Sequence, residues 1–325
     1  MKVFVAGATG ALGKQLVPML VQAGHEVTGM TRSPAKEELI RGMGARPAVA
    51  DALDPEAVAQ VVAEAEPDAV IHELTDLTGT FARNIDKSFA TTNLLRTEGL
   101  DHLLAAAKAA GARRFVAQSF TGWPYKPVGG PVKDEEDPLN DDPPKTVVES
   151  LAAIRHVEDT VTRADGLVGI ALRYGGFYGP GTSLAFDPPG DLTEMIAKRR
   201  VPIVGDGAGI WSLVHIEDAA SATAAALERG EPGVYNVADD DPVPVGELMP
   251  ELARQIGAKP PRHLPRWVGR LASGEVGVMM MTQVRGASND KAKRELGWEL
   301  RYPSWRLGFR DGLERSGGAA VRSAA

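Results

Sequence analysis

Apolar residues in the first half of the chain follow two alternating patterns. Short apolar runs with the length of buried strands occur at residues 3–6, 24–30, 45–50, 69–74, 114–118 and 169–174. Apolar residues at helical spacing follow the first run, at Leu16, Val17, Leu20 and Val21. Because strands and helices alternate, the pattern predicts an α/β fold: a doubly wound parallel sheet covered by helices on both faces.

The helical segments are bounded by recognisable start and stop residues. Asp54 and Pro55 are typical of a helix N-cap and first position. Residues 91–110 are predicted to form one long helix that ends at Gly111, and residues 35–43 and 150–164 two further helices.

The pattern changes after residue 178, where prolines and glycines become frequent. A helix near 191–199, a helix within 214–228, a strand at 233–237 and a helix near 245–256 are the elements expected there. We predict a nucleotide-binding domain of residues 1–178 plus 213–238. A small C-terminal substrate lobe would comprise 179–212 plus 239–312, followed by a flexible tail at 313–325.

Three glycines follow the first strand at intervals of three residues, at Gly7, Gly10 and Gly13. In this context Gly7 permits a tight turn, Gly10 lets the backbone approach a pyrophosphate, and Gly13 allows close helix packing. The N-terminus of the next helix offers free N–H groups to the phosphates. The turn therefore predicts a dinucleotide site, to which Thr9, Ala11 and Leu12 also belong.

The second strand indicates which dinucleotide binds. An NAD site usually has a carboxylate near the end of this strand, about 20 residues after the glycines. Here the strand ends in Thr31-Arg32-Ser33, and Glu26 lies at its other end. A guanidinium flanked by hydroxyls suits a 2′-phosphate, so the sequence predicts NADP(H) in preference to NAD(H). The alternative is that Arg32 is a solvated loop cation.

Ligands of such sheets bind beyond the carboxyl ends of the strands. The residues at those ends are further candidates for the site: Asp51, Leu74, Thr75, Ser119 and the segment that starts at Arg173.

Composition narrows the class of protein. The net charge of −7 and a pI near 5.5 argue against nucleic acid and anionic membranes as partners. The absence of cysteine excludes disulfides and thiolate chemistry and fits a cytoplasmic protein. The six histidines form no close pair at metal-ligand spacing, so no metal is expected. The first strand begins at once and no apolar run is long enough to span a membrane, so neither a signal peptide nor a membrane anchor is expected. A small-molecule substrate is the expected partner, and a homodimer is left open.

Several motifs together resemble one known family. They are Gly7-Ala8-Thr9-Gly10-Ala11-Leu12-Gly13, Asp51-Ala52-Leu53-Asp54, Asn93, 115–119, 173–181, 214–220 and 233–237. On these residues, residues 1–312 resemble the extended short-chain dehydrogenases/reductases of the NAD-dependent epimerase/dehydratase group. The resemblance implies a Rossmann domain with a substrate lobe, and it adds as cofactor-binding residues Ala52, Asn93, Tyr174, Gly176 and Phe177.

One feature of that family is missing. Its members usually carry a catalytic tyrosine and, four residues later, a lysine on the helix before the sixth strand. Ser150 and Ile154 occupy these two positions here, and no tyrosine of the chain has a lysine four residues later. Ser119 and Tyr125 are the candidates for a rebuilt proton relay.

Aromatic residues near these positions are candidates for the substrate pocket. We expect Trp123, Tyr178 and Trp211 to form its walls. Trp123 and Tyr125 could equally be wall aromatics only, without a catalytic role.

Three functions remain open on the sequence alone. The leading hypothesis is an NADP(H)-dependent oxidoreductase acting on a carbonyl or alcohol of a small organic molecule. A nucleotide-sugar epimerase or dehydratase is the second. The third is a non-catalytic NADP(H)-binding sensor or partner-binding protein, which the missing pair favours.

Overall fold

The computed structural model describes residues 1–77 and 83–311 of the chain. Its centre is a seven-stranded sheet in the order β12-β7-β5-β4-β1-β2-β3, in which every neighbouring pair is parallel. The strands are β1 (Lys2–Ala6), β2 (Glu26–Thr31), β3 (Arg46–Val49), β4 (Ala69–His72), β5 (Arg114–Phe120), β7 (Val168–Tyr174) and β12 (Gly233–Val237). The predicted doubly wound parallel sheet is confirmed, and the predicted flexible tail lies outside the described residues.

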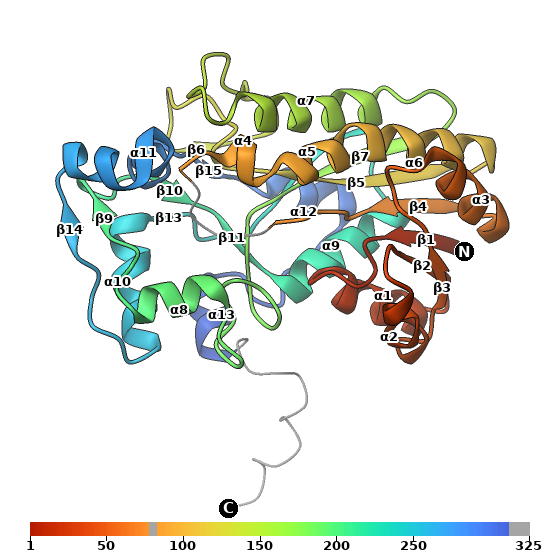
Figure 1. Ribbon diagram of the computed structural model, residues 1–325, viewed down its shortest axis with the longest axis horizontal. Helices are drawn as coiled ribbons and strands as arrows, with labels where there is room; N and C mark the ends of the chain where they lie inside the picture. Colours follow the sequence, from red (N-terminus) through yellow and green to blue (C-terminus); the bar gives the residue numbers. More distant parts are fainter. Residues whose placement is uncertain (78–82, 312–325) are drawn as a thin grey trace, which may run out of the picture.

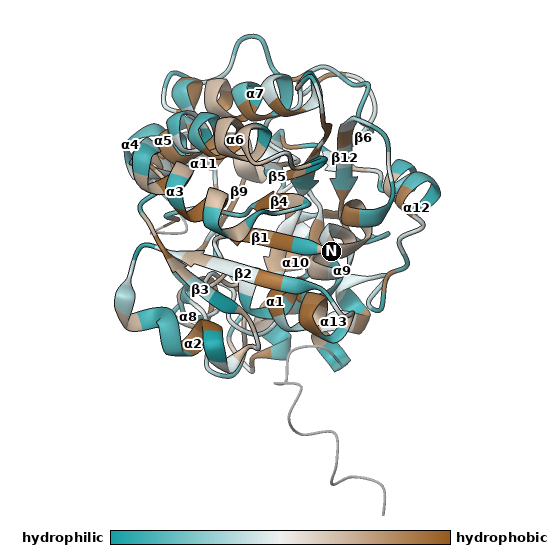
Figure 2. Cartoon of the chain, turned by 90° about the vertical axis from the view of Figure 1, so that its right-hand side faces the viewer, coloured by the Kyte–Doolittle hydropathy of each residue, from teal (hydrophilic) through white to brown (hydrophobic). Residues whose placement is uncertain are grey.

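Helices cover both faces of this sheet, as Figures 1 and 2 show. One face packs against α1 (Gly13–Gln22), α2 (Glu37–Gly42), α9 (Ile216–Glu228) and α12 (Asp290–Leu296). The other packs against α3 (Pro55–Ala65), α5 (Ala90–Arg96), α6 (Glu98–Ala109) and α7 (Val148–Thr162). The carboxylate of Asp54 accepts the N–H groups of Glu56 and Ala57, both at 3.1 Å, which confirms the predicted cap of α3.

The predicted single helix at 91–110 is wrong, because the structure divides it into α5 and α6 at Thr97. The Thr97 backbone is non-helical, with φ −106° and ψ −88°. Its hydroxyl donates to the carbonyl of Asn93 at 2.9 Å. The Asn93 carbonyl also accepts the Thr97 N–H at 3.0 Å, so the hydroxyl adds a second bond at the residue where α5 ends.

The C-terminal half builds a second apolar core. This core is formed mainly by α8 (Asp191–Ala197), α10 (Val245–Gln255), α11 (Arg266–Thr282) and α13 (Trp305–Asp311). Among the described residues, the short strands outside the main sheet form four pairs: β6 (Val132–Lys133) with β15 (Gly286–Ala287), β8 (Gly176–Tyr178) with β11 (Leu213–His215), β9 (Ile203–Val204) with β14 (His263–Leu264), and β10 (Ile210–Trp211) with β13 (Val243–Pro244). The exact domain boundaries stay a prediction, and the pair β6–β15 joins the two proposed domains.

Two short helical segments complete the order of elements. A single 3₁₀ turn, η1 (Pro34–Lys36), follows β2, and α4 (Ile85–Ser88) precedes α5.

Candidate functional site at the carboxyl edge of the sheet

The glycine turn after β1 has the tight geometry that the sequence predicts. Gly7 has φ +100°, and a Cβ on it would lie 2.7 Å from the carbonyl oxygen of Glu73. A Cβ on Gly13 would lie 2.3 Å from the carbonyl oxygen of Gly7. Neither position tolerates a side chain, so both glycines hold the turn against β4 and α1.

Gly10 differs from the other two glycines. It is exposed, and a Cβ there would meet only the Gly7 carbonyl, at 3.3 Å. Thr9 and Ala11 beside it are partly exposed, whereas Leu12 is buried under the turn. The first turn of α1 carries no acidic side chain. The exposed backbone and the uncompensated N-terminus of α1 together fit a pyrophosphate.

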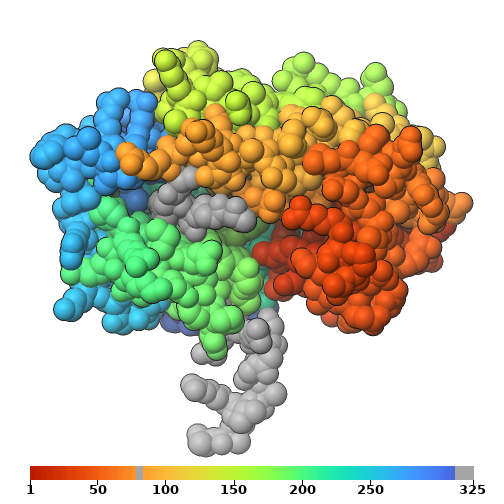
Figure 3. Space-filling view, in the orientation of Figure 1, coloured from red at the N-terminus to blue at the C-terminus, as the bar shows by residue number. Residues whose placement is uncertain are grey.

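Arg32 lies directly after β2 on the same edge. Its side chain is 66% exposed, and a guanidinium nitrogen lies 3.8 Å from a carboxylate oxygen of Asp76. Asp51 is exposed after β3, where it accepts the N–H of Leu53. Figure 3 shows the surface hollowed between the N-terminal segments, in red and orange, and the green segments of the C-terminal half.

The other predicted cofactor residues are divided between the edge and the interior. Leu74 and Thr75 follow β4, and the Leu74 carbonyl accepts the Gln118 amide at 3.2 Å. Ala52 is buried and packs beside Gly99 of α6, so only its neighbour Asp51 faces solvent. Gly176 and Phe177 are partly exposed.

Tyr174 joins a buried hydroxyl chain just below the edge. Its phenol oxygen is 2.9 Å from a carboxylate oxygen of Glu73 and 2.7 Å from the hydroxyl of Thr223. Glu73 is partly exposed as a residue, yet burial of its carboxyl raises its pKa to about 8, against the opposing effect of the Tyr174 phenol. Sequence reasoning missed Glu73, because a single acid at a strand end carries no pattern.

The structure brings Ser119 and Tyr125 together, but in a buried network. The Ser119 hydroxyl donates to Glu158 at 2.7 Å, and the Tyr125 phenol donates to Asn236 at 2.9 Å. Arg173 connects them: it pairs with both carboxylate oxygens of Glu158 at 2.7 Å and donates to the Tyr125 phenol at 2.8 Å. Ser119 is 1% exposed and Tyr125 is 2% exposed.

These contacts leave neither hydroxyl available to a substrate in this arrangement. Each already donates its one proton to an internal acceptor. Burial raises the pKa of the Tyr125 phenol, and the guanidinium of Arg173 only partly offsets this. The catalytic role of Ser119 and Tyr125 stays a prediction, and the geometry favours a structural one that ties β5, α7, β7 and β12 together.

The two positions on α7 where the resemblance places a tyrosine and a lysine are filled. Ser150 and Ile154 are both fully buried, at 0% exposure. Asp86 of α4 accepts the Ser150 N–H at 2.8 Å and its hydroxyl at 2.7 Å, and thereby caps the N-terminus of α7. The Asn93 amide also donates to the Ser150 hydroxyl, at 3.2 Å. Both side chains are therefore part of the buried contact between α7 and its neighbours.

The predicted pocket aromatics have different environments. Trp123 and Trp211 pack in one apolar cluster with Ile154, Val276 and Met279 of α7 and α11. Trp211 is partly exposed and donates to the Met280 carbonyl at 2.9 Å.

Tyr178 is not a pocket wall, which corrects the sequence-based prediction. It is fully buried, and its ring packs edge-on against Phe309 of α13 at 5.0 Å. A Cβ on Gly308 would lie 2.2 Å from its phenol oxygen, so α13 closes directly over it.

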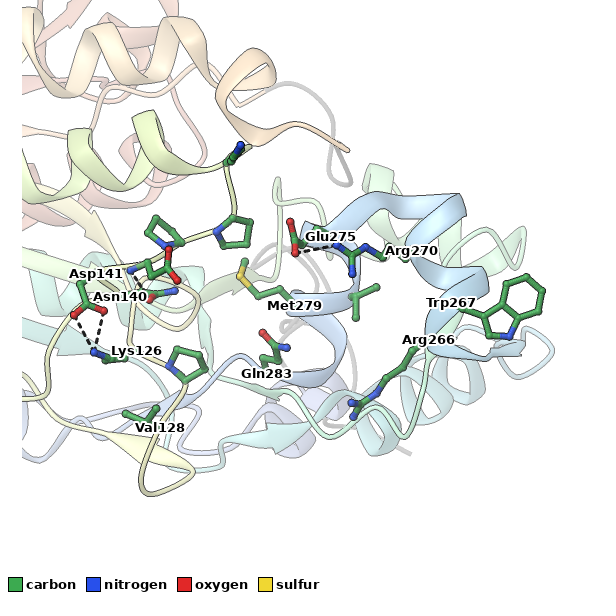
Figure 4. A pocket seen from close by; sticks show the side chains of 16 residues that line it. Lys126, Val128, Asn140, Asp141, Arg266, Trp267, Arg270, Glu275, Met279 and Gln283 are labelled. Atoms are coloured by element: carbon green, nitrogen blue, oxygen red, sulfur yellow. Dashed lines mark hydrogen bonds and ion pairs between the residues drawn. The ribbon is translucent and has the colours of Figure 1, made fainter.

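A separate hollow of about 840 Å³ lies between the 126–145 loop and α11 (Figure 4). Lys126 pairs there with Asp141, and Arg270 with Glu275, while Trp267 points away from the hollow. None of its lining residues belongs to the predicted cofactor set. Its charges mostly neutralise one another, so it offers no strong field to a ligand.

Two further properties concern the described residues only. Among residues 1–77 and 83–311, His, Asp and Glu side chains form no group of three that could hold a metal ion. In the same part of the chain, no helix combines the length and apolar character that crossing a bilayer requires.

Comparisons with known proteins agree with this geometry. Residues 3–238 match the description of the NAD-dependent epimerase/dehydratase family. A 3-diazoavenalumate denitrifying reductase from a Streptomyces species is 42% identical over 316 residues, which cover 97% of this chain and 100% of the relative. A 2-alkyl-3-oxoalkanoate reductase from Stenotrophomonas maltophilia is 30% identical over 273 residues, which cover 79% of this chain and 76% of the relative.

A solved structure extends the likeness to the fold. The UDP-glucose 4-epimerase of Thermus thermophilus, in complex with NAD, superposes with a TM-score of 0.72 and 26% identity. The match covers 98% of this chain and 100% of the epimerase.

Proposed function

Since the chain belongs to the NAD-dependent epimerase/dehydratase family and is an NAD(P)-dependent oxidoreductase, we propose that it uses NADPH to reduce a small aromatic substrate without a tyrosine acid on α7. The observation that carries the proposal is that Ser150 and Ile154 are fully buried on α7, at the two positions where the family resemblance would place a tyrosine and a lysine. A reaction that needs no proton at the substrate oxygen would suit this site.

The preference for NADPH rests on Arg32. The guanidinium follows β2 and remains largely exposed, where a 2′-phosphate could pair with it. Gly10 and the N-terminus of α1 would hold the pyrophosphate. The bound nicotinamide would supply a hydride at its C4 carbon.

An aryl diazonium group is the substrate class that we propose. Replacement of this group by hydrogen consumes one hydride and no external proton. The electron pair of the hydride becomes the new C–H bond, and the pair of the broken C–N bond leaves with N₂. The relative that is 42% identical over its whole length is named for a denitrifying reduction of a diazo compound.

The apolar cluster beside α7 would receive such a substrate. Phe120 ends β5, and together with Phe89 and Trp211 it is partly buried against the cluster that contains Trp123. Aromatic faces attract a cationic aromatic ring by stacking and by their quadrupole. The members of this cluster are apolar and include no general acid, so its contribution would be to orient the ring and exclude water.

The test uses the purified full-length protein, NADPH deuterated at C4 and 4-carboxybenzenediazonium as the probe. The expected products are deuterated benzoate and N₂, formed in equal amounts with the NADPH consumed. Gly10→Val is the control for cofactor binding, since its side chain would occupy the pyrophosphate site; its Cβ would make one tight contact, 3.3 Å from the Gly7 carbonyl oxygen, so circular dichroism must first show that the variant is folded. If the wild-type protein consumes NADPH with this probe no faster than Gly10→Val does, the proposal is overturned.

Carbonyl reduction is the second candidate, because the relative that is 30% identical is named as an oxoalkanoate reductase. On this alternative a 2-alkyl-3-oxo acid would be reduced to the alcohol with NADPH. Tyr125→Phe and Ser119→Ala would then lower turnover by about 10²–10⁴ with nearly unchanged NADPH affinity. Unaltered turnover in both variants would confine Ser119 and Tyr125 to a structural role.

We also propose that the protein acts in the cytoplasm and that it forms a homodimer. The cysteine-free composition supports the first. Sedimentation of the purified protein would test the second.

A further inference from the structure

Arg32 and Asp76 come from strands on opposite sides of β1. Arg32 follows β2, Asp76 follows β4, and the sheet order places β1 between these two strands. The contact of 3.8 Å between the two side chains therefore crosses above the carboxyl end of β1, where the glycine turn begins. A dinucleotide bound along this edge would pass close to both groups.

The backbone of Asp76 is anchored while its carboxylate is free to turn. Its N–H donates to the hydroxyl of Thr92 at 3.0 Å, and Thr92 is fully buried in α5. The Asp76 side chain is 34% exposed, and its only charged contact among the described residues is Arg32. The backbone of Asp76 is therefore held in place, and the charged partner of its carboxylate is the exposed Arg32 side chain.

A carboxylate at this place bears on the preference for NADPH that the sequence predicts. The segment after β2 contains no acid that could bind a ribose 2′-hydroxyl, and that absence pointed to NADPH. The structure brings such an acid to Arg32 from the β4 side. A free 2′-hydroxyl can donate a hydrogen bond to the carboxylate, whereas with a 2′-phosphate the carboxylate competes for Arg32 and repels the added negative charge.

We propose that Asp76 is a specificity-determining residue that weakens NADPH binding and supports NADH binding, so that Arg32 and Asp76 together set the cofactor ratio. The inference rests on the proposed dinucleotide site at this edge. It predicts a protein that accepts both cofactors and whose preference is adjustable at a single side chain.

Asp76→Asn tests this assignment, because asparagine has the same shape and no charge. Glu26→Gln is the matched control: it removes one negative charge from the same strand as Arg32, at the opposite edge of the sheet. Dissociation constants for NADPH and NADH are measured by calorimetry on the full-length variants. No substrate is needed.

In Asp76→Asn we expect NADPH to bind about 3–10-fold tighter and NADH about 3–10-fold weaker, the scale of an exposed charge contact. Glu26→Gln should change neither constant by more than about twofold. In an Arg32→Ala background, Asp76→Asn should no longer tighten NADPH binding, because the competition for Arg32 is gone.

Equal changes for both cofactors, or no change, would overturn the assignment of Asp76. So would a gain in NADPH affinity that persists in the Arg32→Ala background. A wild-type protein that prefers NADH would contradict the proposed use of NADPH. The ratio of NADPH affinity to NADH affinity would still have to rise in Asp76→Asn. The two proposals therefore fail on different measurements.

Discussion

Arg32 carries the proposed preference for NADPH on a single guanidinium. In Arg32→Ala we expect NADPH to bind about 10-fold more weakly, at the lower end for a charge-assisted contact because the side chain is 66% exposed. NADH affinity should change by much less. Arg41→Ala is the control, because Arg41 is a nearby cation already paired with Glu37 and Glu38. Equal weakening of both cofactors would show that Arg32 does not read the 2′-phosphate.

Glu73 gives the edge of the sheet a residue with an unusual charge state. Three oxygen–oxygen contacts run from Glu73 through Tyr174 and Thr223 to the Ala219 carbonyl. The Tyr174 hydroxyl donates to Glu73, and the Thr223 hydroxyl donates to the Ala219 carbonyl. Burial of the Glu73 carboxyl outweighs the bond from Tyr174 and raises the pKa of Glu73 to about 8.

This pKa makes folding stability depend on pH with a defined sign. The ordinary pKa of a glutamate is 4.5, so between pH 4.5 and about 8 the native state holds a proton that the unfolded chain releases. The contribution of Glu73 is therefore full below pH 4.5 and is lost as the pH rises toward 8. Glu73→Gln keeps the neutral contact and removes the titration.

The comparison is made by urea unfolding of both proteins between pH 5 and 9. Relative to the wild type, Glu73→Gln should gain about 1–3 kcal/mol across this range, discounted because Glu73 is partly exposed. Parallel stability profiles would show that Glu73 is already ionised in the native state.

At the scale of elements, α4 is bonded to the N-terminus of α7, and the contact between them is buried. Asp86 of α4 caps α7, and Ser150 and Ile154 of α7 are fully buried. Ser150→Tyr combined with Ile154→Lys would force a large phenol and an unpaired ammonium into this contact. We expect a loss of about 3–5 kcal/mol or more in unfolding free energy and no gain in ketone reduction.

Thermal unfolding and turnover with a ketone measure the two effects. Ser150→Ala is the milder companion, with an expected loss of about 1–3 kcal/mol, because it leaves one bond of Asp86 unmade. A double variant that is as stable as the wild type and reduces the ketone faster would contradict this prediction. It would mean that the contact between α4 and α7 accommodates the larger side chains.

Local sequence signals located most elements but missed how they meet. The glycine turn, the Asp54 cap and the alternating apolar runs depend on neighbours in sequence, so they could be predicted. The break at Thr97 lies in the backbone angles of a single residue, and the composition of the segment does not reveal it. Likewise, which face of β5 Ser119 occupies depends on the register of the whole strand.

At the scale of the whole molecule, the parallel sheet could be predicted from the sequence, while the groups that face each other at its edge could not. The alternating pattern implies neighbours in a parallel sheet, and the family resemblance implies the lobe. Asp76 reaches Arg32, and Glu158 pairs with Arg173, only because segments far apart in sequence converge. Such contacts leave no periodic signal in a single chain.

The interleaving of the two halves limits how this protein can be re-engineered. β15, from the C-terminal segment, pairs with β6, which is inserted after β5. Trp298 and α12 return to the core under the main sheet. The substrate lobe therefore cannot be exchanged for another as one continuous segment of the chain. A transplanted lobe would have to bring its own version of residues 126–140 and of the final segment, or the recipient would lose part of its first core with it.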